Sequence, residues 1–393
     1  MLSLACGLPI LLGLALLVFA EPAGGADSFT AVSTAMRECI SRQEAAGVVT
    51  LVAKRDKVLH LEAAGLADIA AKAPMRTDSI FWVASMTKPI TATAVLMLQD
   101  EGKLSVDDPV AKYLPELGDL KTADGTPAKL TLRHLLTHTS GMSEATGAQS
   151  KNAHSLADLI PCYVGKPLKF APGSKWQYCQ SGINCLGRIV EVVSGQSFPA
   201  FLQKRLFTPL GMKDTTFYLS AEQLPRLAKT YQRTNDTLQE DLFDVSGRTS
   251  ADPSRYPAPN GGLFSTASDY AKFCRMILGH GALDGKRYLK PESVKLMTTA
   301  QTGDLKTGFS PGNGWGLGWC VVREPQGITA ILSVGTCGHG GAFGTQAWID
   351  PVKQVVYVLM FQRVNFPTNS DESEVRRAFQ VAAAGALGFG AEH

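Results

Sequence analysis

Alternation of apolar and polar residues marks both ends of the chain. Residues 47–54 and 57–64 form two alternating runs joined by Arg55-Asp56, which predicts a β-hairpin. Near the C-terminus, strand-like runs occupy residues 316–322, 344–349 and 354–361, with Asp350-Pro351 at the turn between the last two. A further candidate strand covers residues 328–334. The pattern therefore predicts strands near both ends.

Helical spacing of apolar residues fills most of the remaining chain. Residues 28–43 and 371–387 are expected to be helical, the second segment capped by Ser370. Strands from both ends with helices between them predict a single sheet in an α+β domain, with a helical lobe of about residues 86–300 inserted in it. Within that lobe, helical spacing covers residues 90–100, 132–136, 185–193, 198–206 and 268–278.

The first 26 residues differ from the rest. An apolar run at residues 8–19 is shorter than the roughly 20 residues that a membrane span needs, and small residues precede Asp27. We interpret residues 1–26 as a signal peptide and 27–393 as the mature domain, secreted or periplasmic. The segment before the apolar run has no Lys or Arg, so an uncleaved N-terminal anchor is the alternative. Both interpretations place the domain outside the cytoplasm.

Composition excludes some functions and leaves others open. The chain is 45% hydrophobic and 19% charged, as in a globular protein. Its net charge is only +3, with Lys and Arg scattered, so no nucleic-acid partner is expected. Of eight cysteines, Cys6 leaves with the signal peptide, and the others include no CxxC pair that would suggest zinc or thioredoxin-like chemistry. Buried free thiols are expected, and one disulfide stays an open alternative.

The sharpest local motif is Ser85-Met-Thr-Lys88-Pro89. Residues three apart share one face of a helix, so Ser85 and Lys88 are expected to touch. Proline is tolerated only in the first turn of a helix, so Pro89 predicts that the helix begins close to Ser85. A serine there lies where free N–H groups favour negative charge, and a lysine of lowered pKa would activate it as a nucleophile.

Two later segments carry further candidates. The turn-rich stretch around Tyr178-Cys-Gln180 places a phenol and an amide before a predicted helix, and a tyrosine near a lysine can relay a proton. The segment Cys337-Gly-His339-Gly-Gly341-Ala342 surrounds a histidine with glycines, which allow close approach of backbone to a ligand. Alone, each segment would be read as an ordinary loop.

Together these motifs resemble those of class C β-lactamases, DD-peptidases and family VIII carboxylesterases. The resemblance extends over roughly residues 30–390 and includes residues 132–141, 206–212, 261–269 and 315–319. It implies a β-lactamase/transpeptidase-like fold with an antiparallel sheet of about five strands flanked by helices. It also implies a serine hydrolase without cofactor, in which Ser85 is acylated, Lys88 and Tyr178 act as bases, and the backbone N–H groups of Ser85 and Ala342, next to Gly341, form the oxyanion hole.

Two residues depart from that pattern. Gln180 stands where the family usually has Asn, and His339 stands where β-lactamases have Lys. Histidine is mostly neutral at pH 7, so the carboxylate of a β-lactam would lose a charge-assisted hydrogen bond. We therefore expect a carboxylesterase acting on uncharged esters, with weak β-lactamase activity. The alternatives are a class C-like β-lactamase, a DD-peptidase, an acyltransferase, or a non-catalytic penicillin-recognising protein.

Other features have structural interpretations. His134 and His138 are spaced as in a zinc motif, but Leu135 replaces the required glutamate and no third ligand is evident, so we expect structural histidines and no metal. The expected partner is a small ester or amide, and the oligomeric state is not predicted. Four aromatic residues near the motifs either line the substrate cleft or belong to the core: Phe170, Trp176, Trp319 and Phe343.

Overall fold

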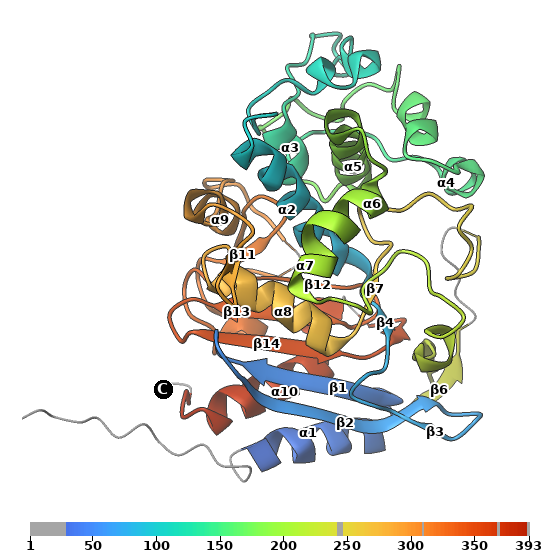
Figure 1. Cartoon of the computed structure of the whole chain (residues 1–393), viewed down its shortest axis with the longest axis vertical. Helices are drawn as coiled ribbons and strands as arrows, with labels where there is room; N and C mark the ends of the chain where they lie inside the picture. The colour runs from blue at the N-terminus through green and yellow to red at the C-terminus, as the bar shows by residue number, and fades with distance from the viewer. Residues whose placement is uncertain (1–28, 242–246, 309, 368–369, 391–393) are drawn as a thin grey trace, which may run out of the picture.

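One antiparallel sheet is built from both ends of the chain (Figure 1). The structure, a computed structural model, describes residues 29–241, 247–308, 310–367 and 370–390. The sheet has eight strands in the order β10-β11-β12-β13-β14-β1-β2-β3, rather than the five expected. The strands are β1 (Gly47–Ala53), β2 (Val58–Asp68), β3 (Ala73–Pro74), β10 (Asn313–Trp315), β11 (Cys320–Val322), β12 (Cys337–Gly340), β13 (Gln346–Asp350) and β14 (Val355–Met360).

The hairpin and the last two strands were predicted correctly, whereas the strands between them differ. The run at residues 316–322 is not one strand, because β10 and β11 pair with each other and are joined by a turn at residues 316–319. The candidate at residues 328–334 is wrong: it holds a 3₁₀ turn, Gly327–Thr329, and its apolar pattern reflects the burial of Leu332. Instead β12 supplies the neighbouring strand.

Helices cover both faces of the sheet (Figure 1). Helices α1 (Thr30–Ser41) and α10 (Glu374–Ala386) pack together below it, and α8 (Ala267–Leu278) packs on β1, β13 and β14 from above. Alternate residues of β1 therefore enter different cores: Val48 contributes to the lower core and Val49 to the upper one. Ser373, not Ser370, caps α10.

Most other helices lie above α8, farther from the sheet (Figure 1). Each predicted helical segment overlaps an observed one; residues 198–206 span α6 and a π-helical turn at Gln203–Phe207. The helices are α2 (Thr87–Asp100), α3 (Leu132–Leu136), α4 (Gly147–Asn152), α5 (Gln180–Ser194), α6 (Phe198–Leu202), α7 (Thr208–Leu210) and α9 (Pro291–Thr298). Short strand pairs complete the fold: β4 (Phe81–Trp82) with β7 (Phe264–Ser265), β5 (Tyr231–Thr234) with β6 (Thr237–Glu240) and β15 (Arg363–Val364), and β8 (Ala282–Leu283) with β9 (Lys286–Arg287).

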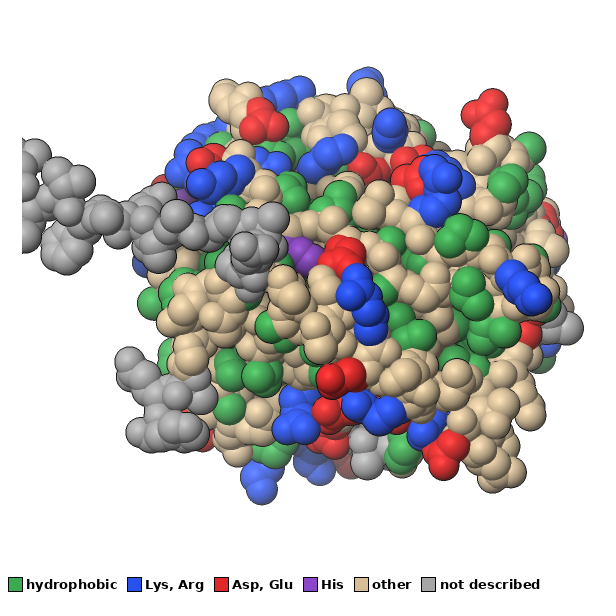
Figure 2. Space-filling view, turned by 90° about the horizontal axis from the view of Figure 1, so that it is seen from below, with side chains coloured by type: hydrophobic (Ala, Val, Ile, Leu, Met, Phe, Trp, Pro, Cys, Tyr) green, Lys and Arg blue, Asp and Glu red, His purple; other side chains and the backbone are tan. Residues whose placement is uncertain are grey.

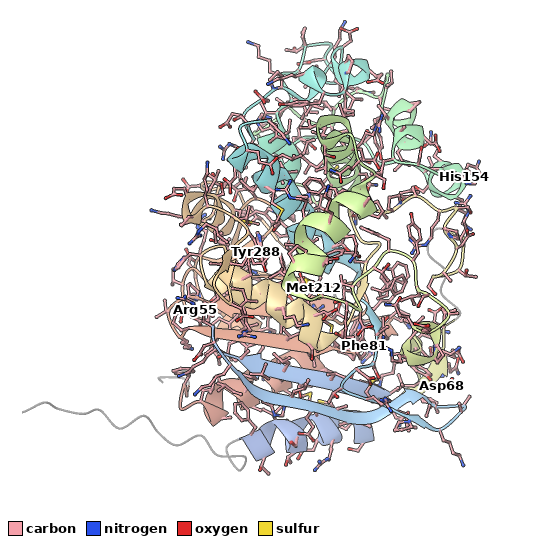
Figure 3. All side chains as sticks on the ribbon, in the orientation of Figure 1. Arg55, Asp68, Phe81, His154, Met212 and Tyr288 are labelled. Atoms are coloured by element: carbon pink, nitrogen blue, oxygen red, sulfur yellow. The ribbon has the colours of Figure 1, made fainter. Side chains whose placement is uncertain are left out.

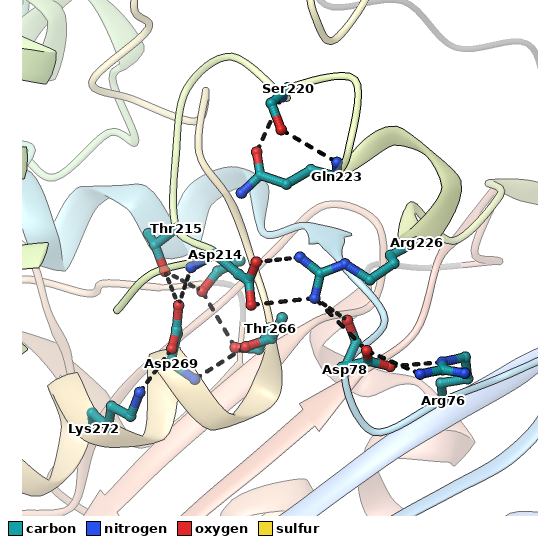
Figure 4. Close-up of polar contacts among 11 residues, drawn as sticks. Arg76, Asp78, Asp214, Thr215, Ser220, Gln223, Arg226, Thr266, Asp269 and Lys272 are labelled. Atoms are coloured by element: carbon teal, nitrogen blue, oxygen red, sulfur yellow. Dashed lines mark hydrogen bonds and ion pairs between the residues drawn. The ribbon is translucent and has the colours of Figure 1, made fainter. Parts of the chain in front are cut away.

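A polar network fixes the segment that leads into the nucleophile motif. Arg226 forms ion pairs with Asp214 and Asp78, just before β4, and the backbone N–H of Asp214 donates to Asp269 on α8 (Figure 4). Phe81, which opens β4, lies where the helices meet the sheet (Figure 3). The network thus ties the residues before β4 to α8.

The surface carries charges of both signs (Figure 2), and the cysteines form no disulfide among the described residues. Basic and acidic side chains stand side by side over much of the lower face (Figure 2). The seven cysteines from Cys39 to Cys337 are all free thiols; five are buried as expected, whereas Cys162 and Cys320 are partly exposed. None of the helices within the described residues has the length and apolar character to cross a membrane. Residues 1–26, and with them the predicted signal peptide and Cys6, lie outside the described residues.

Candidate active site

Ser85 and Lys88 lie at the N-terminal end of α2. Ser85 belongs to a 3₁₀ turn, Ala84–Met86, and α2 begins at Thr87, which places Pro89 in its first turn. The helix therefore begins next to Ser85, as Pro89 predicts. The Lys88 Nζ atom lies 3.1 Å from Ser85 Oγ, within hydrogen-bond distance. Local sequence alone thus brings the amine to the hydroxyl.

Lys88 is fully buried, and its burial controls its charge. Loss of hydration lowers the pKa of its amine to about 7, against a smaller opposing effect from the negative charge of Glu144. Its Nζ also donates to the Asn260 carbonyl at 2.6 Å. A neutral amine has two N–H donors and one lone pair, so a bond to Asn260 leaves the lone pair for the Ser85 proton. Near neutral pH the geometry suits a general base.

Tyr178 stands two residues before α5, beside both groups. Burial raises the pKa of its phenol far above the ordinary value, against the opposing effect of a hydrogen bond with Ser85. Its ring centroid lies 4.6 Å from Lys88 Nζ. The phenol is therefore protonated near neutral pH, which makes it a proton donor rather than the initial base.

His339, on β12, is held in one neutral tautomer. Burial, with the positive charges of Lys88 and Arg376, lowers its pKa to about 3. Its Nδ1 lies 2.6 Å from the Gly340 carbonyl, which only accepts, so Nδ1 carries the hydrogen. Nε2 is then an acceptor, and it faces the Tyr178 hydroxyl at 3.5 Å. At neutral pH His339 thus presents an acceptor where a lysine would present a charged donor.

His134 and His138, which have the spacing of a zinc motif, each stabilise a different part of the local structure. His134 Nδ1 accepts from the backbone N–H of Thr131 at 3.2 Å and so caps α3. His138 Nδ1 accepts from the backbone N–H of Cys179 at 3.1 Å, and its ring lies 4.5 Å from that of Tyr178. Both act as structural histidines, and the described residues hold no cluster of three or more metal-ligating side chains.

Gln180 opens α5 and faces Asn260. Its Oε1 accepts from Asn260 Nδ2 at 3.1 Å, so its amide is held beside the residue whose carbonyl binds Lys88. The backbone N–H groups of Gln180 and Ser181 donate to the Glu144 carboxylate at 2.7 and 2.9 Å. Glu144 therefore caps the helix that follows Tyr178, an anionic cap at the positive end of the helix dipole.

A cavity of about 330 Å³ joins these groups. Ser85 opens into it, while Lys88 is buried behind the serine. None of the four aromatic residues considered from the sequence lines it; Trp319, for example, stacks on Phe273 in the core. The predicted residues on its wall are Ser85, Tyr178, Gln180, His339, Gly341 and Ala342, and the others are Gly308, Ser310, Asn313, Trp315, Cys320, Ile328, Thr329, Gly340, Trp348 and Asp371.

Comparisons with known proteins identify the family to which this chain belongs. The sequence profile of the family named Beta-lactamase matches residues 32–382. The chain is 34% identical to protein Rv1367c of Mycobacterium tuberculosis over 83% of this chain and 88% of that protein. The chain belongs to the Beta-lactamase family. It is also 32% identical to esterase EstB of Burkholderia gladioli over 80% and 85% of the two chains, and 33% identical to penicillin-binding protein 4 of Amycolatopsis lactamdurans over 74% and 73%.

Solved structures support the Beta-lactamase family fold. EstCE1, described as a hydrolase with promiscuous acyltransferase activity, superposes with a TM-score of 0.76 at 24% identity, covering 90% of this chain and 98% of that one. A penicillin-binding protein homologue from Pyrococcus abyssi gives a TM-score of 0.72 at 24% identity, with coverage of 92% and 78%. These structures confirm the expected fold class. Together with the family profile and the relatives above, they identify the protein as a β-lactamase-fold serine hydrolase, as the resemblance implied.

Sequence reasoning missed three residues of this Beta-lactamase family site. Asn260 and Glu144 carry no motif, because the first acts through its carbonyl and the second through a helix N-terminus far along the chain. Ser310 stands in Gly308-Phe-Ser310-Pro-Gly312, which matches the GxSxG pattern of α/β-hydrolase nucleophiles. It lies in a bend just before β10 rather than on a strand–helix elbow, so the match does not make it a nucleophile of that type.

Proposed function

We propose that this protein is a serine carboxylesterase that works through an acyl-enzyme on Ser85. The observation that carries the proposal is the buried Lys88, whose pKa of about 7 and 3.1 Å distance to Ser85 Oγ suit a general base. A base is most effective when its pKa lies near the working pH, and burial of an amine is one means of reaching that range.

The proposed reaction has two steps. Ser85 Oγ attacks the ester carbonyl carbon as its proton passes to the Lys88 amine, and the N–H groups of Ser85 and Ala342 stabilise the negative oxygen. The carbonyl then re-forms, the alkoxide leaves, and it takes a proton from the Tyr178 hydroxyl, which Lys88 reprotonates. Water next attacks the acyl carbon as its proton passes to Lys88; the bond to Ser85 Oγ then breaks, Lys88 returns the proton to Oγ, and the acid is released. Tyr178 is suited to the donor role because burial keeps its phenol protonated.

The state of His339 supports uncharged esters as the preferred substrates. Its neutral ring offers Nε2 as an acceptor, so the carboxylate of a β-lactam would meet no charged donor there. EstB and the lovastatin esterase of Penicillium rubens, 31% identical over 76% of this chain and 83% of that protein, carry esterase in their names. Similarity to penicillin-binding protein 4 makes a slower reaction with β-lactams the natural second activity to measure.

The test compares two chromogenic substrates on three proteins: wild type, a nucleophile variant and a surface control. We expect wild-type protein to hydrolyse 4-nitrophenyl butyrate with a higher kcat/KM than nitrocefin, and Ser85→Ala to lose both activities. Lys295→Ala, which changes an exposed side chain of α9, is the matched control and should behave as wild type. Faster turnover of nitrocefin would favour a β-lactamase. A wild-type protein that neither hydrolyses the esters nor reacts with a fluorophosphonate at Ser85 would favour a non-catalytic binding protein.

A further inference from the structure

Arg376 on α10 is a fully buried charge directed at the loop that follows β12. Its Nη2 donates to the carbonyls of Gly341 at 2.9 Å and Thr345 at 2.6 Å, and its Nε donates to the Gly344 carbonyl at 2.9 Å. Its Nη1 forms an ion pair with Asp371. One guanidinium thus holds three carbonyls of residues 341–345, which we call the oxyanion loop because it contains Ala342.

The same loop is anchored on its other side to the nucleophile segment. The Thr345 hydroxyl donates to the carbonyl of Val83 at 3.3 Å, two residues before Ser85. The Gly341 N–H donates to the Thr345 carbonyl at 2.7 Å and closes the loop. A Cβ on Gly341 would lie 2.6 Å from the Val83 carbonyl oxygen, so loop and segment approach more closely than a side chain would allow. The loop is therefore held between β4–α2 and α10.

The charge of Arg376 is energetically unfavourable to bury, so the contacts that it makes are the feature to explain. A buried charge is strongly destabilising unless it is paired and its donors are satisfied. Here the bonds go to three carbonyls of one five-residue loop, and the planar fork of arginine matches several acceptors where the single ammonium of lysine would not. α10 otherwise packs against α1 and the sheet through apolar residues such as Val375 and Phe379.

We propose that Arg376 is a positioning residue that fixes the Ala342 N–H for the oxyanion of the reaction. The proposal rests on the proposed function, in which that N–H faces the developing negative charge. Displacement of one oxyanion donor lowers kcat by about 10²–10³-fold in acyl-transfer enzymes, so a loosened loop should lower kcat more than it raises KM. Arg376 acts through the loop and does not touch the substrate.

The decisive experiment uses an oxygen ester and its thiono analogue, in which C=S replaces C=O. Sulfur is a weak hydrogen-bond acceptor, so the thionoester gains little from oxyanion donors. We expect Arg376→Lys to lower kcat for 4-nitrophenyl butyrate about 10–100-fold with KM changed less than about 2-fold, and to lower the rate on the thionoester less than about 3-fold. Arg377→Lys is the matched control, because Arg377 is the exposed neighbour paired with Glu374.

A second measurement separates positioning from the proposed function. Hydrogen exchange of the amides in residues 341–345 should be faster in Arg376→Lys than in wild type and in Arg377→Lys. Equal losses on both esters, or unchanged exchange, would overturn the positioning role. If wild type lacks Ser85-dependent ester hydrolysis, the proposed function fails, whereas exchange still decides whether Arg376 orders the loop. Should Arg376→Lys not fold, Asp371→Asn removes the ion pair with Arg376. Because Asp371 also lines the cavity, its effect is judged by exchange in residues 341–345 together with the two esters, and we expect faster exchange and a loss of about 2–5-fold on the oxygen ester only.

Discussion

Two bases beside Tyr178 show that burial can produce opposite chemical behaviour. Lys88 and His339 are both buried, and for both the loss of hydration lowers the pKa. For the lysine this brings the pKa to about 7, where it titrates at working pH. For the histidine it brings the pKa to about 3, where the ring stays neutral. The same physical effect thus makes one base responsive to pH and the other fixed.

The surroundings of the two bases explain the difference. Lys88 has a carbonyl acceptor in Asn260 and a nearby negative charge in Glu144, both of which favour its protonated form. His339 instead experiences the positive charges of Lys88 and Arg376, and its hydrogen is committed to the Gly340 carbonyl. With ordinary reference pKa values, about 10.4 for lysine and 6.5 for histidine, the histidine would be the group that titrates near pH 7 and the lysine would stay charged.

The largest effect is expected from removal of the responsive base. Lys88→Met should lower kcat for ester hydrolysis by roughly 10³-fold, because Ser85 loses its proton acceptor. The same change should stabilise the fold at pH 7, because an amine that is hard to bury is replaced by an apolar chain. A chevron or thermal melt measures the second effect, and the unpaired Asn260 carbonyl should reduce the gain.

The pH dependence of the free energy of unfolding tests whether the amine of Lys88 causes that stability change. The folded-state pKa of Lys88, about 7, lies below the unfolded value, so between pH 7 and about 10.4 the unfolded chain binds more protons. The free energy of unfolding attributable to Lys88 therefore rises with pH across that window. The advantage of Lys88→Met over wild type should be largest at pH 7 and shrink towards pH 10; an advantage independent of pH would contradict the assignment.

A somewhat smaller effect should follow from pH alone. Because Lys88 must be unprotonated to act, kcat/KM for a neutral ester should rise with pH through an inflection near pH 7. At pH 5 the rate should be about 100-fold lower than its plateau. A profile measured from pH 5 to 9 should show this single acid limb, and an inflection near pH 6.5 that disappears in His339→Gln would instead assign the limb to His339.

Replacement of the neutral His339 by a charged residue tests its role in substrate preference. His339→Lys should raise the ratio of nitrocefin to ester turnover about 10-fold or more, the size expected from a charge-assisted hydrogen bond to the lactam carboxylate. His339→Gln, which is neutral, is the matched control and should leave the ratio within about 3-fold of wild type. A ratio that rises equally in both variants would mean that removal of the imidazole, not the added charge, opens the site to β-lactams.

The two bases also differ in how far sequence could predict them. Ser85 and Lys88 are three residues apart on one helical turn, so spacing and Pro89 were enough to predict their contact. The strand of His339, β12, was missed because Cys337-Gly-His-Gly lacks the alternation that marks a strand. Its neutral state depends on burial and on two cations from distant elements, which no local pattern encodes.

The fold shows the same division between local and distant information. The hairpin β1–β2 and helix α8 follow from periodicity in one short segment. The extent of the sheet does not, because β3, β10 and β11 are only two or three residues long and are too short for an alternating pattern to mark them, although each pairs with a strand nearby in the sequence. Family resemblance supplied the overall architecture, whereas the roles of Asn260, Glu144 and Arg376 required the three-dimensional contacts.

The smallest predicted effect concerns the negative charge that supports the responsive base. Glu144 caps α5 through the N–H groups of Gln180 and Ser181, and its charge raises the pKa of Lys88. Glu144→Gln keeps an acceptor for the cap but removes the charge, so the acid limb of kcat/KM should move to lower pH. At pH 6 the variant should then retain about 2–5-fold more of its own plateau rate than wild type does.

A matched variant distinguishes this electrostatic effect from a loosened helix. Glu191, which lies on α5 itself, accepts from the backbone N–H of Phe198 at 3.1 Å, and its charge does not contribute to the pKa shift of Lys88. Glu191→Gln should lower the melting temperature to a similar extent while leaving the acid limb unchanged. An acid limb that moves in both variants would show that α5 transmits a general structural change. Movement in Glu144→Gln alone would establish that the charge of Glu144 adjusts the pH at which the responsive base works, against the larger effect of burial.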